Sequence, residues 1–176
     1  MTSATPVIAD PAAPAPAPRP FVLRGVLIML AAIEAWFGFS DAPTLFGDMS
    51  HIGPGLGGGL IKAHLALHPL LATAALAFAA AGRVRQAIIA LGTIIITNWL
   101  SDMPSVVGHG LEFRSAFSAV ETTARIIGFP LIAACAIAYA AHNEHLGRAT
   151  LLVAVPTLFT IVLLVGFIVG VMIHGF

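Results

Sequence analysis

The sequence predicts an all-α fold, a polytopic transmembrane bundle with about five spans. Hydrophobic residues make up 59% of the 176-residue chain and charged residues only 9%, whereas soluble domains carry about 25% charged residues. Such a chain has too few polar groups to cover a surface in water. Apolar stretches recur along it, each near the ~20 residues that cross the hydrocarbon core. The formal net charge of zero gives no indication of a nucleic-acid partner.

The predicted elements follow one another along the chain. They are a disordered Pro/Ala-rich tail over residues 1–20 and one transmembrane domain over 21–176, with spans at about 21–40, 60–82, 84–102, 115–141 and 149–173. The tail favours extended chain and has little apolar surface to bury. A tight turn at Gly82–Arg85 separates spans two and three. Pro130 and Pro156 lie within spans four and five, where a membrane helix tolerates a kink.

The distribution of charged residues predicts the orientation. One side of the predicted spans carries Arg19, Arg24, Arg83, Arg85 and Arg148, and the other carries Asp41, Asp48, Asp102 and Glu112 with only Lys62 and Arg114. The positive-inside rule places the N-terminus in the cytoplasm and the C-terminus outside. We therefore expect a multi-pass protein of a bacterial-type cytoplasmic (inner) membrane, with the lipid bilayer as its principal partner.

Five ionisable residues lie inside these apolar stretches: Glu34, His64, His68, Glu121 and Arg125. A charge at the bilayer centre costs about 2.5–3.5 kcal/mol even on insertion scales, so such residues usually face one another inside a bundle. All five fall in the predicted outer half. His64/His68 and Glu121/Arg125 have i,i+4 spacing, which places both members of each pair on one helical face.

Three further polar residues are expected at the outer mouth of this cluster. Asn98 and Asp102 form another i,i+4 pair, at the end of span three, and His109 follows in the next predicted loop. On span two, Pro69 has no amide hydrogen for the Leu65 carbonyl, so the helix is expected to bend near His68. Four predicted helices thus bring polar side chains to one side of the bilayer.

A pair of histidines one turn apart suggests a metal site. With a carboxylate from another helix, His64 and His68 form a ligand set for zinc, or for iron bound by two histidines and a carboxylate. Glu34 or Glu121 is the expected carboxylate. Haem with two axial ligands needs the second one from outside this helix, and no other span has a histidine near mid-membrane. That ligand would have to be a loop residue, a methionine or a residue of a second chain, or haem would have a single axial histidine. The sequence therefore favours a non-haem metal (zinc or iron) over haem, without identifying the cofactor.

Three functional hypotheses follow. The leading one is an outward-facing site that binds a metal or cofactor for redox or hydrolytic chemistry, in which Arg125 holds Glu121 ionised or binds an anionic group. The first alternative is a non-catalytic structural or assembly subunit, because small residues in spans two and four allow a second copy or a membrane-complex partner to pack closely. In that case Glu121 and Arg125 simply neutralise each other. The second alternative is a proton-coupled transporter with a Glu/His relay, although no inverted repeat is detectable.

Overall fold

The computed structural model describes residues 20–47, 52–53, 55–111, 113 and 115–174. Within these residues five helical segments are long and apolar enough to cross a membrane. The predicted all-α bundle with five spans is therefore confirmed. The Pro/Ala-rich tail lies outside the described residues, as do Asp48, Glu112 and Arg114.

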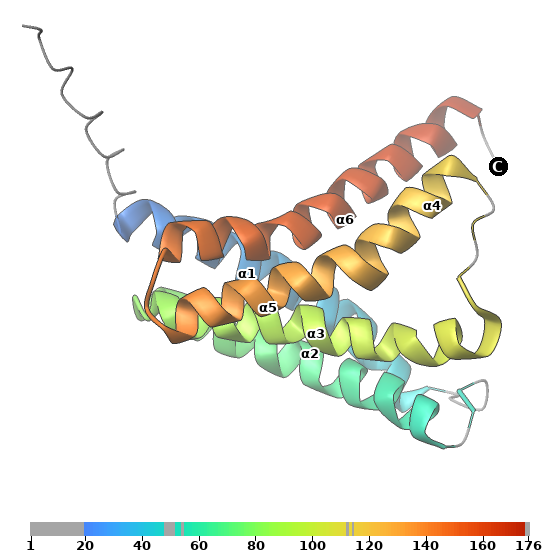
Figure 1. Cartoon of the computed structure of the whole chain (residues 1–176), viewed down its shortest axis with the longest axis horizontal. Coiled ribbons are helices and arrows are strands. Elements are labelled where there is room, and N and C mark those ends of the chain that lie inside the picture. Colours follow the sequence, from blue (N-terminus) through green and yellow to red (C-terminus); the bar gives the residue numbers. More distant parts are fainter. Residues whose placement is uncertain (1–19, 48–51, 54, 112, 114, 175–176) are drawn as a thin grey trace, which may run out of the picture.

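The helices follow the predicted order (Figure 1). They are α1 (Pro20–Asp41), a 3-10 turn (Ala42–Phe46), α2 (Leu56–Ala80), α3 (Val84–His109), α4 (Ala116–Thr123), a π-helical segment (Ala124–Gly128), α5 (Phe129–Ala141) and α6 (Leu146–His174). α4, the π-helical segment and α5 together form one span, Ala116–Ala141.

α3 differs from the expected third span. It continues past residue 102 to His109, so Asp102 lies within the helix and His109 is its last residue, not part of a loop. Polar residues at 98–102 suggested a membrane boundary, but Asp102 lies within α3, where its partly exposed carboxylate pairs with Arg125. The helix ends where Gly110 adopts φ +78°, a conformation that glycine tolerates best.

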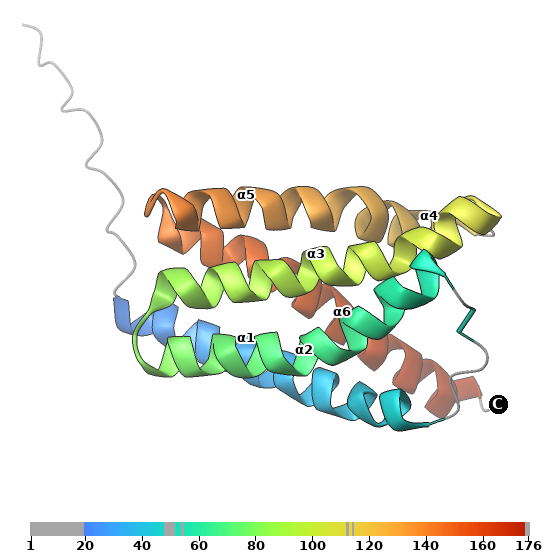
Figure 2. The ribbon, with the colours of Figure 1, turned by 90° about the horizontal axis from the view of Figure 1, so that it is seen from below.

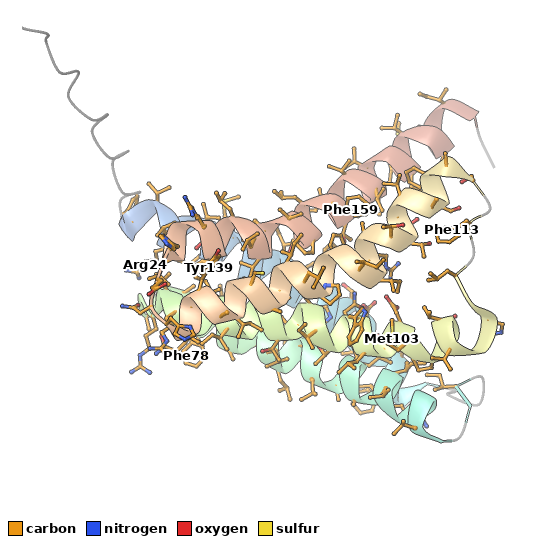
Figure 3. The ribbon with its side chains drawn as sticks, in the orientation of Figure 1. Arg24, Phe78, Met103, Phe113, Tyr139 and Phe159 are labelled. Atoms are coloured by element: carbon orange, nitrogen blue, oxygen red, sulfur yellow. The ribbon has the colours of Figure 1, made fainter. Side chains whose placement is uncertain are left out.

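The bundle has two distinct ends. The α2–α3 and α5–α6 turns lie at one end with the start of α1, and we call this the Arg83 end (Figure 1). The end of α1, the start of α2 and the α3–α4 connection lie at the other, which we call the Asp41 end. Figure 3 shows Tyr139 at the Arg83 end and Met103 at the Asp41 end.

The apolar core fills the half of the bundle toward the Arg83 end. Alanines from α1, α2, α3, α5 and α6 are fully buried there: Ala31, Ala72, Ala75, Ala79, Ala87, Ala136, Ala140 and Ala149. Small side chains let helix backbones approach closely in membranes. Leu27, Ile88 and Val153 fill the space between them.

Toward the Asp41 end the helices separate. α6 packs against α5, where Phe129 and Phe159 meet edge to face with ring centroids 5.4 Å apart. Beyond this contact α6 diverges from α4 (Figure 2), and no Cα atom of α4 or of the π-helical segment lies within 8 Å of one in α6. The core therefore gives way to a space between the helices.

Candidate functional site

A cavity of about 340 Å³ lies between the core and the Asp41 end. All five spans contribute residues to its lining. Its polar lining includes Glu34, His64, His68, Asn98, Glu121 and Arg125. The structure thus brings all five ionisable residues of the predicted cluster, together with Asn98, to one cavity.

The most enclosed polar contact in the cavity joins three helices. The Glu34 Oε2 atom lies 3.1 Å from the His68 Nε2 atom, and the Thr157 hydroxyl donates to Glu34 Oε1 at 2.7 Å. Only 10% of the His68 side chain and 15% of the Glu34 side chain are exposed. A carboxylate at this depth is tolerable because both of its oxygens have partners.

Close approach of α1 and α2 sets the position of this contact. Gly38 lies one turn after Glu34, and a Cβ atom there would lie 2.9 Å from the Pro69 backbone nitrogen. Glycine therefore lets the α1 backbone touch α2 directly beside His68. α2 also changes direction near its middle (Figure 2), where the sequence predicts a bend at Pro69.

His64 stacks on His68 and borders the same cavity. The two ring centroids lie 5.2 Å apart with an interplanar angle of 29°. His64 Nδ1 lies 3.3 Å from the Thr97 hydroxyl oxygen, and this hydroxyl itself donates to the Ile94 carbonyl at 2.9 Å. Nδ1 is therefore the donor to Thr97, and the Nε2 atom of a neutral His64 is left as an acceptor.

A second polar cluster lies nearer the Asp41 end, around Arg125. Its guanidinium donates to Asp102 Oδ2 at 3.0 Å and to Oδ1 at 3.4 Å, while Glu121 lies 3.7 Å away. The sequence predicted Glu121 as the partner and placed Asp102 only at the mouth. The i,i+4 spacing identified the weaker contact, between Arg125 and Glu121. The stronger contact, with Asp102, comes from α3 and depends on how the helices pack. Arg125 remains 43% exposed at its side chain.

Trp99 is a cavity residue that sequence analysis did not identify. Its indole nitrogen donates to the Ile126 carbonyl at 3.0 Å, and this carbonyl belongs to the π-helical segment. Pro130, one turn later, has no amide hydrogen to give to Ile126. A proline within a span signals such a free carbonyl, but the sequence does not say which helix supplies the donor.

Thr157 was also missed, although it donates to Glu34. Little in the sequence indicates this role, because Thr157 is only a hydroxyl residue beside Pro156 in an otherwise apolar span. Threonines in membrane helices often bond to their own backbone, as Thr150 does with the Leu146 carbonyl. Only the packing of α6 against α1 distinguishes the two threonines.

The two carboxylates expected as alternative third ligands lie in different places. Glu34 contacts His68, whereas Glu121 lies by Arg125. Among the described residues, no three His, Cys, Asp or Glu side chains are grouped so as to hold a metal ion. His109 is exposed and borders a second, more superficial hollow that shares Glu121 and Arg125 with the cavity. The side chains of His51 and His174 lie outside the described part of the chain.

Comparisons with protein-family models, with curated proteins and with solved structures found no match to this chain.

Proposed function

We propose that this membrane protein binds a small-molecule cofactor or substrate in the cavity, with Glu34 and His68 as the buried pair that shapes the binding site and takes part in proton exchange with the ligand. The contact between these two side chains carries the proposal. A carboxylate and an imidazole lie 3.1 Å apart, both are largely buried, and both border the cavity. Ionisable groups in such an environment are typical of functional sites in membrane proteins.

The one-sided position of the cavity favours binding over proton transport. Between the cavity and the Arg83 end, the described core is made of alanine, leucine, isoleucine and valine side chains. The buried polar residues in the described chain are His68, Thr150 and Thr157, and the Thr150 hydroxyl bonds within its own helix. A relay that crosses the membrane needs polar groups in both halves. Among the described residues, His68 and Thr157 lie at the cavity, and Thr150, the buried polar residue near the Arg83 end, has its hydroxyl already bonded.

A bound metal is the second candidate, supported by the proximity of the His64 and His68 rings, whose centroids lie 5.2 Å apart on one helix. Both oxygens of Glu34 already have protein partners. A metal at the two histidines would therefore take its remaining ligands from the substrate or from water.

Paired variants separate these candidates from a purely structural role. Glu34→Gln and His68→Gln should each lower the amount of ligand bound to the protein purified in detergent by about tenfold, because each removes a hydrogen bond to a charged group. Glu144→Gln and His142→Gln make the same substitutions at exposed positions at the Arg83 end. These two variants should bind as much ligand as the wild type. Absorption spectra, metal analysis and solvent extraction measure the bound species.

The outcomes of this experiment are distinct. Loss of an organic ligand in the two cavity variants supports the proposal, and loss of a metal supports the second candidate. The proposal is overturned if the wild type carries neither, or if the cavity variants retain as much ligand as the two controls.

We infer that the Asp41 end, and with it the cavity, faces the outside of a cytoplasmic membrane. The support is the gathering of Arg24, Arg83, Arg85 and Arg148 at the opposite end, together with the positive-inside rule. A reporter fused after Phe176 should be active outside the cytoplasm, and one fused in the α2–α3 turn should be active inside. The reverse pattern would show that the orientation is inverted.

A further inference from the structure

α4 and α6 border the cavity without packing against each other. Residues of α4 and the π-helical segment line the cavity, and so do residues of α6, yet no Cα atoms of these elements approach within 8 Å of one another. The contact between Phe129 and Phe159 closes the gap on the core side; Phe159 is labelled in Figure 3. Val120 of α4 and Leu164 of α6, chain neighbours of the lining residues Glu121 and Leu163, are apolar and exposed. An opening between these two helices would therefore face hydrocarbon.

Glu34, Glu121 and Arg125, three of the four Asp, Glu and Arg residues that line the cavity, are already engaged, which disfavours an ionic ligand beside them. The fourth, Asp41, is exposed at the end of α1. Arg125 is held by Asp102 and Glu121. Both oxygens of Glu34 are occupied, by His68 and by Thr157. A bound anion or cation would have to displace one of these contacts. The protein charge that lost its partner would then be buried unpaired, which is costly.

The remaining lining suits a flat, uncharged ring that carries oxygen atoms. Phe37, Trp99, Phe129 and Phe159 come from four different helical elements, and aromatic side chains pack well against a planar ligand. His64 supplies an acceptor at Nε2 when neutral and a donor when protonated. The volume of about 340 Å³ lies at the small end of the about 300–1,000 Å³ typical of ligand pockets.

We propose that the ligand is the ring of a membrane-dissolved quinone or quinol, which reaches the cavity through the opening between α4 and α6 while its apolar tail stays in lipid. This inference rests on the proposed binding function and specifies the ligand class. His64 Nε2 accepts a hydrogen bond from a quinol hydroxyl or, when protonated, donates one to a quinone oxygen. The side opening provides a path along which the tail does not have to leave the bilayer.

Trp99 provides a direct reporter for this proposal. The chain has two tryptophans; Trp99 borders the cavity, whereas Trp36 is 73% exposed. In a Trp36→Phe background, decylubiquinone should quench the fluorescence of Trp99 along a saturable curve. The reciprocal Trp99→Phe protein should show only the linear quenching of a quinone dissolved in detergent. Decyl phosphate and decyltrimethylammonium share the same tail and should not displace the quinone.

Two sets of variants test the contacts. His64→Ala should weaken the saturable binding about tenfold, the effect of one strong hydrogen bond. Thr160→Phe places a large side chain at the cavity edge of α6 and should slow or weaken binding. Val162→Phe makes a similar change on an exposed residue of the same helix that does not line the cavity, and should bind as the parent does.

Linear quenching of Trp99, displacement by either charged amphiphile, or unchanged affinity in His64→Ala would overturn the quinone proposal. If the quinone fails to bind but the purified wild type carries another ligand that Glu34→Gln removes, the ligand class is wrong and the binding function stands. If the quinone fails and no ligand is found in the wild type, both proposals fail.

Discussion

Replacing Gly38 with valine should lower the stability of the bundle by about 1–3 kcal/mol, the usual cost of overpacking. Even a Cβ atom at this position would lie 2.9 Å from the Pro69 backbone nitrogen and 3.0 Å from its Cα atom. Backbone atoms cannot rotate aside as a side chain does, so α1 has to move away from α2. Glu34, one turn earlier, would then move away from His68. Thermal unfolding in detergent measures the loss.

Gly25 offers a matched control on the same helix. No atom lies within 4 Å of a Cβ placed there, so Gly25→Val should leave stability nearly unchanged. Gly38→Ala should change stability in the same direction as Gly38→Val, by a smaller amount. Equal unfolding temperatures for the valine variants at positions 25 and 38 would show that α1 and α2 do not meet closely at Pro69.

Arg125→Ala should have the second largest effect. The change leaves Asp102 and Glu121 without their shared cation, and at least one carboxylate then has to be protonated or hydrated. Because Arg125 is 43% exposed, we expect a loss of about 1–2 kcal/mol, between the values for exposed and buried ion pairs. Thermal unfolding of the purified protein measures this loss.

A variant of Asp102, the partner of Arg125, provides a comparison for Arg125→Ala. Asp102→Asn should cost less than Arg125→Ala, because Arg125 keeps Glu121 as a partner. The double variant should be more stable than the sum of the single losses predicts, as expected for residues in direct contact. Arg85→Ala removes an exposed arginine at the Arg83 end. It serves as the control for the loss of one positive charge. Strict additivity would mean that Arg125 and Asp102 do not form a pair.

The sequence was sufficient for the class of fold and for the buried ionisable residues that line the cavity. Long apolar stretches determine membrane spans almost by themselves, because lipid leaves no alternative to helices for a single chain of this kind. The i,i+4 spacings also identified which polar residues share a helical face. Glu34, His64, His68, Glu121 and Arg125 do border one cavity, as the cost of burying charges in lipid requires.

The side-chain contacts between different helices could not be predicted from the sequence. Whether Arg125 meets Asp102 as well as Glu121 depends on the rotation and axial position of α3 relative to the span that carries Arg125, and packing decides both. The contact of Gly38 with Pro69 fixes the position of α1 relative to α2. The spacing of these residues in the sequence does not predict this contact. For the same reason Thr157 and Trp99, whose roles come from neighbouring helices, were not identified.

A double-mutant comparison of ligand content tests most directly whether Glu34 and His68 form one binding unit. The amount of bound ligand is measured by extraction and mass spectrometry on protein isolated from its own membrane. Glu34→Gln, His68→Gln and the double variant should lose ligand to the same extent, because either change breaks the same contact. Ligand content in the double variant equal to that of the wild type, or separate losses that multiply, would contradict a binding site built on this pair.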